Sequence, residues 1–395
     1  MKVLFVTQLF DPTRGGGEVV FNLAAKELAK RDHTVYVLRH KVRDEQSSEN
    51  LSPNLEICDV DPTLDYAGGL PFNISQSLLY LFNAVRYGLK IVKDKEIDVI
   101  HANTYVPVFI GAFISKLTGR PLVITIHDVA LMNGLSFWKR WMNQFKASFL
   151  HSFVGYAAEF LTINTPADII VTVSEASRDD ILSVRKNCSV FVIPNGLDVS
   201  LYKVQDSSIK YGDEVVFIGR AVYYKNLEVV LKAMKTVVQK NPNAKLIVIG
   251  TGPMTLSWKK LAIDYGVEKN VVFKGHVSEE EKINILERAT SLVLPSIWEG
   301  FGMVLLEAWA LKKPVIVARV RPLSDLVEHE RDGFHAHPFE PAEWAEHLDV
   351  LLKNKNLAKQ MGEAGYNKLV KNFTAEEAVR KLETLYRELS ARGTG

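Results

Sequence analysis

The stretch "SLVLPSIWEGFGMVLLEAWALKKPVIVAR" (residues 291–319) carries a complete strand–helix–strand unit. Its first apolar run, 291–296, predicts a buried strand, and the glycines of "EGFG" allow a tight turn. A helical pattern begins near Met303, and a second buried strand follows at 314–319. Two buried strands joined by a helix are typical of a parallel sheet that is covered by helices on both faces.

The same alternation of short apolar runs and helical stretches extends along the rest of the chain. In the first half we expect helices that include 18–31 and 76–95, and strands at 2–8, 34–40, 55–60, 98–102, 121–127, 168–174 and 189–195. After a polar stretch the pattern restarts, with further strands at 214–219, 244–250 and 270–275. The sequence therefore predicts an α/β protein with two doubly wound, parallel-sheet domains of the Rossmann-like kind.

The length of the chain supports this division into domains. A chain of 395 residues is too long for one ordinary core. We expect an N-terminal domain at 1–198 and a C-terminal domain at 199–373, with the last helix, 374–393, packing back on the first domain. Because open parallel sheets bind ligands at the carboxyl ends of their strands, we expect the two domains to face each other across a cleft.

Composition narrows the range of functions. Hydrophobic residues make up 47% of the chain, as in soluble globular proteins, and a net charge of +2 gives no field that would select nucleic acid. Cys58 and Cys188 lie far apart without metal-ligand spacing, so we expect free thiols and a cytoplasmic location, although counting alone leaves a disulfide open. The first residues indicate a buried strand rather than a signal peptide, and we expect no membrane-spanning helix.

Two acids, Glu299 and Glu307, flank the start of the helix that begins near Met303. Free backbone N–H groups at 301–304 would suit an anion such as a diphosphate, because the positive end of the helix lies behind them. The loop carboxylate of Glu299 could accept hydrogen bonds from sugar hydroxyls, and Glu307 could reach a neighbouring polyol such as ribose. An N-capping acid followed by a solvated helix acid would give the same spacing.

Two cations follow another predicted strand. In "RAVYYKN" (220–226), Arg220 and Lys225 lie just past the end of the strand at 214–219. Two cations at the carboxyl edge of a parallel sheet would neutralise a diphosphate leaving group. A lone arginine or lysine is more often a surface charge, but the position of these two favours a functional role.

Glycine-rich turns follow two further strands. "DPTRGGGEVV" (11–20) places Gly15 and Gly16 before a helix, where the backbone could approach a phosphate closely. The dinucleotide fingerprint GxGxxG is not met because residue 20 is valine, which argues against a nicotinamide dehydrogenase. "VIGTGPM" (248–254) is a similar strand-end turn, and both stretches would also fit ordinary turns.

Histidines end two predicted strands of the first half. His127, in "TIHDVA", could contact sugar hydroxyls, and His101, in "DVIHA", holds a similar position, although a lone histidine is more often structural. The Asp-x-Asp of "CDVDP" (58–62) matches a pattern that binds Mg²⁺ with diphosphates, but it better fits a strand exit and turn before the proline. We therefore expect no metal site.

The stretch 134–153 combines aromatic and basic residues. Trp138, Trp141, Phe145 and Phe149 fall near helical spacing, with lysines and an arginine beside them. A single amphipathic helix of this composition suits a membrane surface. It also suits ordinary packing against the sheet.

Taken in order, these motifs resemble glycosyltransferase family 4, whose members are retaining enzymes of the GT-B fold. The resemblance covers nearly the whole chain and rests on "RGGGE", "TIHD", "VSEASRDDI" (173–181), "IPNGLD" (193–198), "RAVYYKN" and "EGFGMVLLE". One departure follows "PVIVAR", where "VRPLSDLVEHERDG" stands in place of the usual glycine pair before an acid. This departure leaves the nearby substrate contacts open.

The resemblance implies roles for particular residues. Those implied to be catalytic are Glu299, His127, Arg220 and Lys225. Those implied to bind substrate are Gly15, Gly16, Phe301, Gly302, Met303 and Glu307. In the second domain the two cations would hold the diphosphate, the first acid and the backbone amides the sugar, and the second acid the ribose. The histidine would contact the sugar from the first domain.

The resemblance also implies a retaining hexosyltransferase that uses a nucleotide sugar as its substrate, with no cofactor and no metal. A UDP-sugar is favoured over a GDP-sugar. The acceptor is expected to be a glycan or a lipid-linked molecule. The composition of 134–153, rather than the resemblance, raises the hypothesis of peripheral membrane contact through this stretch, at the inner face of the membrane. Two alternatives stay open: an enzyme like the sugar-nucleotide 2-epimerases, which need no acceptor, and a non-catalytic protein that binds nucleotide sugars.

Overall fold

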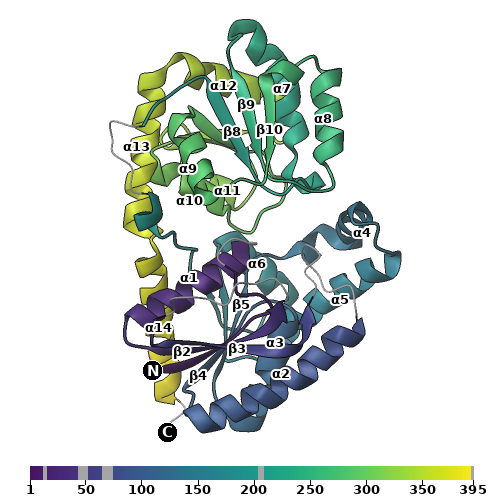
Figure 1. Cartoon of the computed structure of the whole chain (residues 1–395), viewed down its shortest axis with the longest axis vertical. Helices are drawn as coiled ribbons and strands as arrows, with labels where there is room; N and C mark the ends of the chain where they lie inside the picture. Colours follow the sequence, from purple (N-terminus) through teal and green to yellow (C-terminus); the bar gives the residue numbers. More distant parts are fainter. Residues whose placement is uncertain (12–15, 43–51, 65–73, 203–208, 393–395) are drawn as a thin grey trace. The chain divides into compact units, whose positions relative to one another are not determined.

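The chain forms two compact units in the computed structural model, which describes residues 1–11, 16–42, 52–64, 74–202 and 209–392 (Figure 1). The first unit comprises Met1–Gly134, Val154–Gly196 and the C-terminal segment that begins at Ala375. The second unit comprises Leu135–Phe153 and Leu197–Thr374. The chain therefore leaves the first unit twice, once for a short helical segment and once for the whole of the second sheet.

A parallel sheet of seven strands forms the centre of the first unit, in the order β3-β2-β1-β4-β5-β6-β7. Its strands are β1 (Lys2–Val6), β2 (Thr34–Val42), β3 (Leu55–Leu64), β4 (Val99–Ala102), β5 (Leu122–Ile126), β6 (Ile169–Thr172) and β7 (Val190–Val192). The parallel sheet predicted for the first half is confirmed. The strand order reverses between β1 and β4, so the sheet is doubly wound and its switch point lies there.

Side chains that alternate along β1 divide the first unit into two cores. Leu4 and Val6 belong to one core and Val3 and Phe5 to the other, because successive strand residues point to opposite faces of a sheet. The first core includes side chains of α2 (Ile74–Lys95), α3 (Val106–Thr118), α5 (Phe149–Asn164) and α6 (Glu175–Val184). The second includes side chains of α1 (Gly16–Lys30) and α14 (Ala375–Arg392), and these two helices contact each other.

A second parallel sheet, of six strands in the order β10-β9-β8-β11-β12-β13, forms the centre of the second unit. The strands are β8 (Glu214–Ile218), β9 (Lys245–Ile249), β10 (Val271–Gly275), β11 (Ser291–Leu294), β12 (Val315–Ala318) and β13 (Gly333–Ala336). The predicted restart of the strand pattern is confirmed. We did not predict β13, because four residues that include a glycine and a histidine give no clear alternation.

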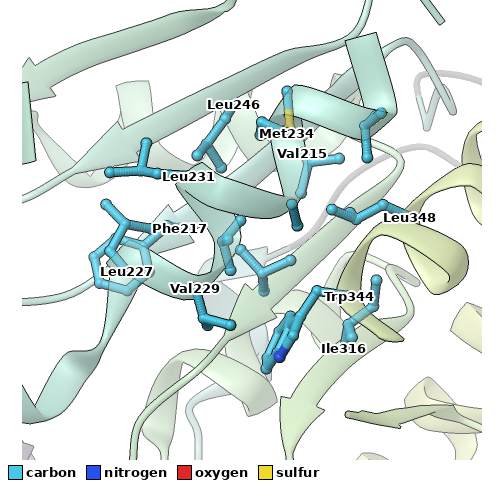
Figure 2. Close-up of a cluster of buried hydrophobic side chains, with 14 of the residues drawn as sticks. Val215, Phe217, Leu227, Val229, Leu231, Met234, Leu246, Ile316, Trp344 and Leu348 are labelled. Atoms are coloured by element: carbon cyan, nitrogen blue, oxygen red, sulfur yellow. The ribbon is translucent and has the colours of Figure 1, made fainter. Parts of the chain in front are cut away.

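The core of the second unit includes Phe217 of β8, Leu227 and Leu231 of α7 (Leu227–Lys240), and Trp344 of α12 (Pro341–Lys353), as Figure 2 shows. Phe217 and Trp344 are fully buried. The other helices of this unit are α4 (Gly134–Gln144), α8 (Thr255–Asp264), α9 (Glu279–Arg288), α10 (Met303–Ala310), α11 (Leu323–Leu326) and α13 (Lys355–Asn372).

Two local predictions were wrong. The stretch 134–153 is not one helix: α4 ends at Gln144 and α5 begins at Phe149, with Lys146 between them at a positive φ of 56°. The motif at 58–62 is not a strand exit, because β3 continues through Pro62 to Leu64. β3 lies at the edge of its sheet, and an edge strand tolerates a proline since part of its hydrogen-bonding capacity is unused.

No described helix is both long enough and apolar enough to cross a membrane.

Candidate active site

Lys225 and Glu299 form an ion pair at the carboxyl edge of the second sheet. Lys225 Nζ lies 3.0 and 2.7 Å from the two carboxylate oxygens of Glu299, and both side chains are mostly buried. Lys225 ends a short 3₁₀ turn, η4 (Tyr223–Lys225), that follows β8, and Glu299 follows β11. Because β8 and β11 are neighbours in the sheet, the loops after them meet at the same edge.

The start of α10 lies beside this pair in the sequence. Gly302, the N-cap of α10, has a φ of 96°, and a Cβ there would lie 3.0 Å from Leu323 and 3.2 Å from Leu294. A glycine is therefore required for both conformation and space. Phe301 is buried, with its ring centroid 6.0 Å from that of Phe373, so its ring packs within the protein. The first N–H groups of a helix, here beginning at Met303, have no partner within the helix.

Glu307 projects from α10 toward a lysine that the sequence analysis did not select. Lys282 Nζ lies 2.9 Å from Glu307 Oε2 and 2.8 Å from Glu279 Oε2, so Lys282 bridges two carboxylates. Burial raises the pKa of Glu307, and Lys282 opposes that rise. Lys282 lies on α9, and the signal that could have selected it is its i, i+3 spacing from Glu279 within "SEEEK".

Arg220 also follows β8, as predicted from the sequence, and is exposed. Its guanidinium lies 3.4 Å from the hydroxyl of Tyr224. The second sheet therefore brings Arg220, Lys225 and Glu299 to the carboxyl ends of two neighbouring strands.

An aromatic cluster supports the loops that carry this pair. It consists of Phe137, Trp138 and Trp141 of α4 with Tyr223, Tyr224 and Trp298. The ring centroids of Phe137 and Trp298 are 5.0 Å apart, and those of Tyr224 and Trp298 are 5.2 Å apart. Since Tyr224 precedes Lys225 and Trp298 precedes Glu299, the cluster fixes the backbone on both sides of the ion pair.

Polar contacts of α4 reinforce this support. Gln144 Oε1 accepts a hydrogen bond of 2.9 Å from the backbone N–H of Tyr223, and the Arg140 guanidinium lies 4.4 Å from the centroid of the Tyr223 ring. Trp138 is fully buried. The aromatic residues of α4 are thus largely used in packing, whereas Lys139 is exposed and Phe149, at the start of α5, is 58% exposed. Membrane contact through 134–153 stays a prediction.

The glycine loop of the first unit is described from Gly16 onward, so Gly15 lies outside the described residues. Gly16 begins α1 and is exposed, and a Cβ there would meet no atom within 4 Å. At Gly17, by contrast, a Cβ would lie 2.9 Å from Cδ2 of His127. The glycine that the packing of His127 requires is therefore Gly17, which the sequence analysis did not single out.

His127 has a defined tautomer. Asn103 Oδ1 accepts a hydrogen bond from the backbone N–H of Thr104, and His127 Nε2 lies 2.9 Å from the same oxygen. Burial lowers the pKa of His127 to about 4, so the ring is neutral at physiological pH. Nε2 then carries the proton, and Nδ1, which has no hydrogen-bond partner among the described residues, is left as an acceptor.

His101, the other strand-end histidine, is part of the core. Its Nδ1 lies 2.5 Å from the hydroxyl of Tyr386 on α14 and its Nε2 2.6 Å from the hydroxyl of Thr125. Burial lowers its pKa to about 3. Because both ring nitrogens have protein partners, His101 fastens the C-terminal helix to the sheet.

The aspartates of the sequence 58–62 have basic neighbours. Asp59 Oδ1 lies 2.7 Å from Nε of Arg39, and Asp61 Oδ1 lies 3.8 Å from Nζ of Lys41. Over the described ranges, no group of three or more His, Cys, Asp or Glu side chains is placed to hold a metal ion. Cys58 and Cys188 are both free thiols.

Comparison with known proteins adds to this geometry. The family model described as Glycosyltransferase Family 4 matches residues 14–201, and that described as Glycosyl transferases group 1 matches residues 204–368. An uncharacterised glycosyltransferase of Methanocaldococcus jannaschii is 27% identical over 371 residues, which cover 90% of each chain. Together, the two family models span most of the chain.

Solved structures share the fold. Sucrose-phosphate synthase from Thermosynechococcus elongatus matches with a TM-score of 0.83 and 19% identity over 99% of both chains. The Anabaena protein HepE, solved in complex with UDP-glucose, matches with a TM-score of 0.73 and 21% identity over 98% of this chain and 99% of its own. By both family matches and by its fold, the chain belongs to the glycosyltransferases of family 4, with the GT-B architecture.

Proposed function

We propose that this glycosyltransferase is a retaining hexosyltransferase that moves a sugar from a nucleotide-sugar donor to an acceptor hydroxyl without a metal ion. The observation that carries the proposal is the Lys225–Glu299 pair, which lies at the ends of neighbouring strands and next in sequence to the start of α10. A cation, a carboxylate and free backbone N–H groups are together suited to a phosphorylated sugar, which is both anionic and rich in hydroxyls.

Each candidate site residue of the second unit has a proposed role in donor binding. Arg220 and Lys225 neutralise the diphosphate. Glu299 accepts hydrogen bonds from hydroxyls of the transferred sugar, aided by the backbone amides of Phe301, Gly302 and Met303. Glu307 accepts hydrogen bonds from the ribose, for which its ionised form is the better acceptor.

His127 and the glycine loop are the proposed contribution of the first unit. The unpaired Nδ1 of His127 accepts a hydrogen bond from a sugar hydroxyl, which suits its neutral tautomer. Gly15 and Gly16 bring the backbone close to the phosphate or the acceptor. Gly17 leaves room for the imidazole ring of His127.

The proposed chemistry retains the anomeric configuration. The acceptor hydroxyl attacks the anomeric carbon from the side on which the nucleotide leaves. The bond from that carbon to the phosphate oxygen breaks, and this oxygen takes the proton of the acceptor. The protein's contribution is to hold both substrates in position and to stabilise the negative charge that develops on the diphosphate.

We propose a UDP-sugar as donor, and the support is that HepE, of the same fold, was solved with UDP-glucose. The proposed acceptor is a glycan or a lipid-linked molecule. An enzyme like the sugar-nucleotide 2-epimerases would need the same donor-binding groups but no acceptor. A non-catalytic binding protein would need them without turnover.

A donor screen tests this proposal. The purified full chain is incubated with common UDP-, GDP- and ADP-sugars, and thermal unfolding and nucleotide release are measured with and without an acceptor mixture. We expect one donor to raise the unfolding temperature and to release nucleotide faster with acceptor. In the matched variant Lys225→Met, which should remove the cation, both effects should be lost.

Other outcomes would favour the alternatives. Release of free nucleotide and an epimerised sugar without acceptor would favour the epimerase. Donor binding without nucleotide release would favour the non-catalytic protein. The absence of stabilisation by any donor would contradict the proposal.

A further inference from the structure

Large apolar side chains are exposed on the outer sides of α2 and α3, two helices that contact each other and contribute to the same core. On α2, Leu79 and Phe82 are 51% and 65% exposed, and the neighbouring Leu78 is also exposed. On α3, Phe113 and Leu117 are 52% and 66% exposed. Scattered apolar side chains are normal on a surface, but a group on adjacent helices marks an interaction site.

Basic side chains accompany the apolar ones. Arg86, Lys90 and Lys93 are exposed along α2, Lys116 is exposed on α3, and Arg120 is exposed just after α3. Leu79, Phe82, Arg86 and Lys90 follow helical spacing, so they share one side of α2. The α2–α3 face is defined here as Leu78, Leu79, Phe82, Arg86, Lys90, Lys93, Phe113, Lys116, Leu117 and Arg120.

Acidic residues are absent from the two helix segments that carry this face. The sequence contains no Asp or Glu from residue 74 to residue 93 or from residue 106 to residue 120. Within the described parts of the chain, the structure also shows no carboxylate paired with any of the five basic side chains of the face. Lys95 at the end of α2, in contrast, is paired with Glu56 at 3.1 Å. The positive charge that α2 gives to the face therefore lies on the part of the helix that precedes Lys95.

The third helix over this core extends the apolar character. On α5, Phe160 and Leu161 are 47% and 55% exposed. The single acid of that helix, Glu159, is buried, and its carboxylate accepts a hydrogen bond of 2.6 Å from the backbone N–H of Ala130. The outer layer of the core therefore offers apolar and cationic groups without exposed acids on α2 before Asp94, on α3 or on α5.

We propose that the α2–α3 face docks the protein on an anionic lipid membrane. Apolar side chains such as Phe82 and Leu117 would enter the boundary between headgroups and acyl chains, while the cations would contact anionic headgroups. A second copy of the chain is a poorer occupant, because a symmetric contact would place like charges against each other. This surface is distinct from α4, whose aromatic side chains are used in the aromatic cluster.

Vesicle co-sedimentation of the full chain tests the proposal. Vesicles of phosphatidylcholine alone are compared with vesicles that also contain phosphatidylglycerol, at low and at high salt. We expect binding to the anionic vesicles at low salt and little binding to the neutral ones. Because each basic residue near an anionic surface contributes roughly a fivefold change in binding, Arg86→Glu with Lys116→Glu should weaken binding by about tenfold or more. Phe82→Ser with Leu117→Ser should weaken it at both salt concentrations.

The matched control places the same kinds of change on α8 in the second unit. Leu256 is 79% exposed and Lys260 is exposed, so Leu256→Ser with Lys260→Glu alters an apolar and a basic residue outside the α2–α3 face. This control should bind vesicles like the wild type, and all variants should keep the wild-type unfolding temperature and donor binding. The proposal would be overturned if the folded wild type bound no vesicles or bound both vesicle types equally. It would also be overturned if the α8 control lost as much vesicle binding as the α2–α3 variants. A dimer in light scattering that the α2–α3 changes abolish while vesicle binding is unaltered would overturn it too.

Discussion

Two lysine–glutamate ion pairs of the second unit have similar nitrogen–oxygen distances, but different elements of the fold carry their residues. Lys225 contacts Glu299 at 2.7 Å, and both residues lie in loops that follow neighbouring strands. Lys282 contacts Glu307 at 2.9 Å, and both residues lie within helices, α9 and α10. Lys282 also contacts Glu279 at 2.8 Å, so its charge is shared between two carboxylates.

The difference indicates what each lysine does. Loops at the carboxyl ends of parallel strands are where ligands bind, so the charge of Lys225 is placed to serve a ligand as well as Glu299. Lys282 is held by two carboxylates and two helices, and its charge is placed to serve the protein: it opposes the rise that burial causes in the pKa of Glu307. We therefore expect loss of Lys225 to damage catalysis and loss of Lys282 to damage donor binding and stability.

The largest expected effect is that of Lys225→Met. This change removes the cation that is proposed to stabilise charge on the leaving diphosphate, so kcat should fall by a factor of about 10²–10³. Steady-state kinetics with the donor found in the screen measure it. Lys225→Arg keeps the charge and should retain more of the activity. A kcat for Lys225→Met within threefold of wild type would show that the charge of Lys225 does not serve catalysis.

The next effect is that of Lys282→Met, which should be largest at neutral pH. Breaking a buried pair leaves Glu307 without its cation, at a cost of about 3 kcal/mol in the free energy of unfolding. Burial then raises the pKa of Glu307 further above its unfolded value. A carboxyl whose pKa is raised by folding destabilises the native state when ionised, so the stability deficit should shrink as the pH falls through that raised pKa. Chemical denaturation at several pH values measures this.

Donor binding by Lys282→Met should show the opposite trend with pH. As Glu307 gains a proton at lower pH, it becomes a poorer acceptor for ribose hydroxyls, so the Kd for the nucleotide should rise more steeply than in the wild type. Lys282→Arg should restore the wild-type profile. A pH-independent loss in Lys282→Met would mean that this lysine acts on the donor directly rather than through Glu307.

A smaller and more selective effect is expected for Phe137→Ala. This change removes a ring that contacts Trp298 and therefore loosens the loops of Lys225 and Glu299, but not the helices of the second pair. The activity should fall several-fold and KM for the donor should rise, while the pH dependence of the activity should stay close to that of the wild type. Kinetics at several pH values measure both. Activity and KM equal to wild type in a folded Phe137→Ala variant would show that α4 does not position the site.

The smallest effect is expected for Glu279→Gln. Glu279 is the more exposed partner of Lys282, with 60% of its side chain accessible, so its pairing contributes little to stability. Lys282 should remain paired with Glu307. The Kd for the nucleotide, measured by calorimetry, should change by less than about twofold. A loss as large as that of Lys282→Met would show that the bridge between both carboxylates, rather than the Lys282–Glu307 contact, is what matters.

The sequence was most informative where residues follow strands. Arg220, Lys225 and Glu299 could be selected because each follows an apolar run that predicts a strand, and the carboxyl ends of parallel strands lie at one edge of a sheet. Glu307 could be selected from its place in the helix after Glu299. Their roles in the reaction remain predictions, as do those of Gly15, Gly16 and His127.

Contacts between distant segments could not be predicted. Lys282 reaches Glu307 across 25 positions of sequence (307 minus 282), and its neighbours suggest only a solvated helix. Gly17 matters because of the ring of His127, more than a hundred residues away. The aromatic residues of α4 have the spacing of a membrane-binding helix, yet Trp141 and Phe137 pack against Tyr224 and Trp298. Periodicity identifies an apolar side of a helix but not its partner.

The most direct test of the central account is calorimetric titration of UDP and GDP into the wild type, Lys225→Met and Glu307→Gln. We expect one of the two nucleotides to bind the wild type, and each substitution to weaken that binding by about tenfold or more, because diphosphate and ribose each lose a partner. Absence of binding to the folded wild type, or equal affinity in all three proteins, would contradict the assignment of the donor site to the second unit.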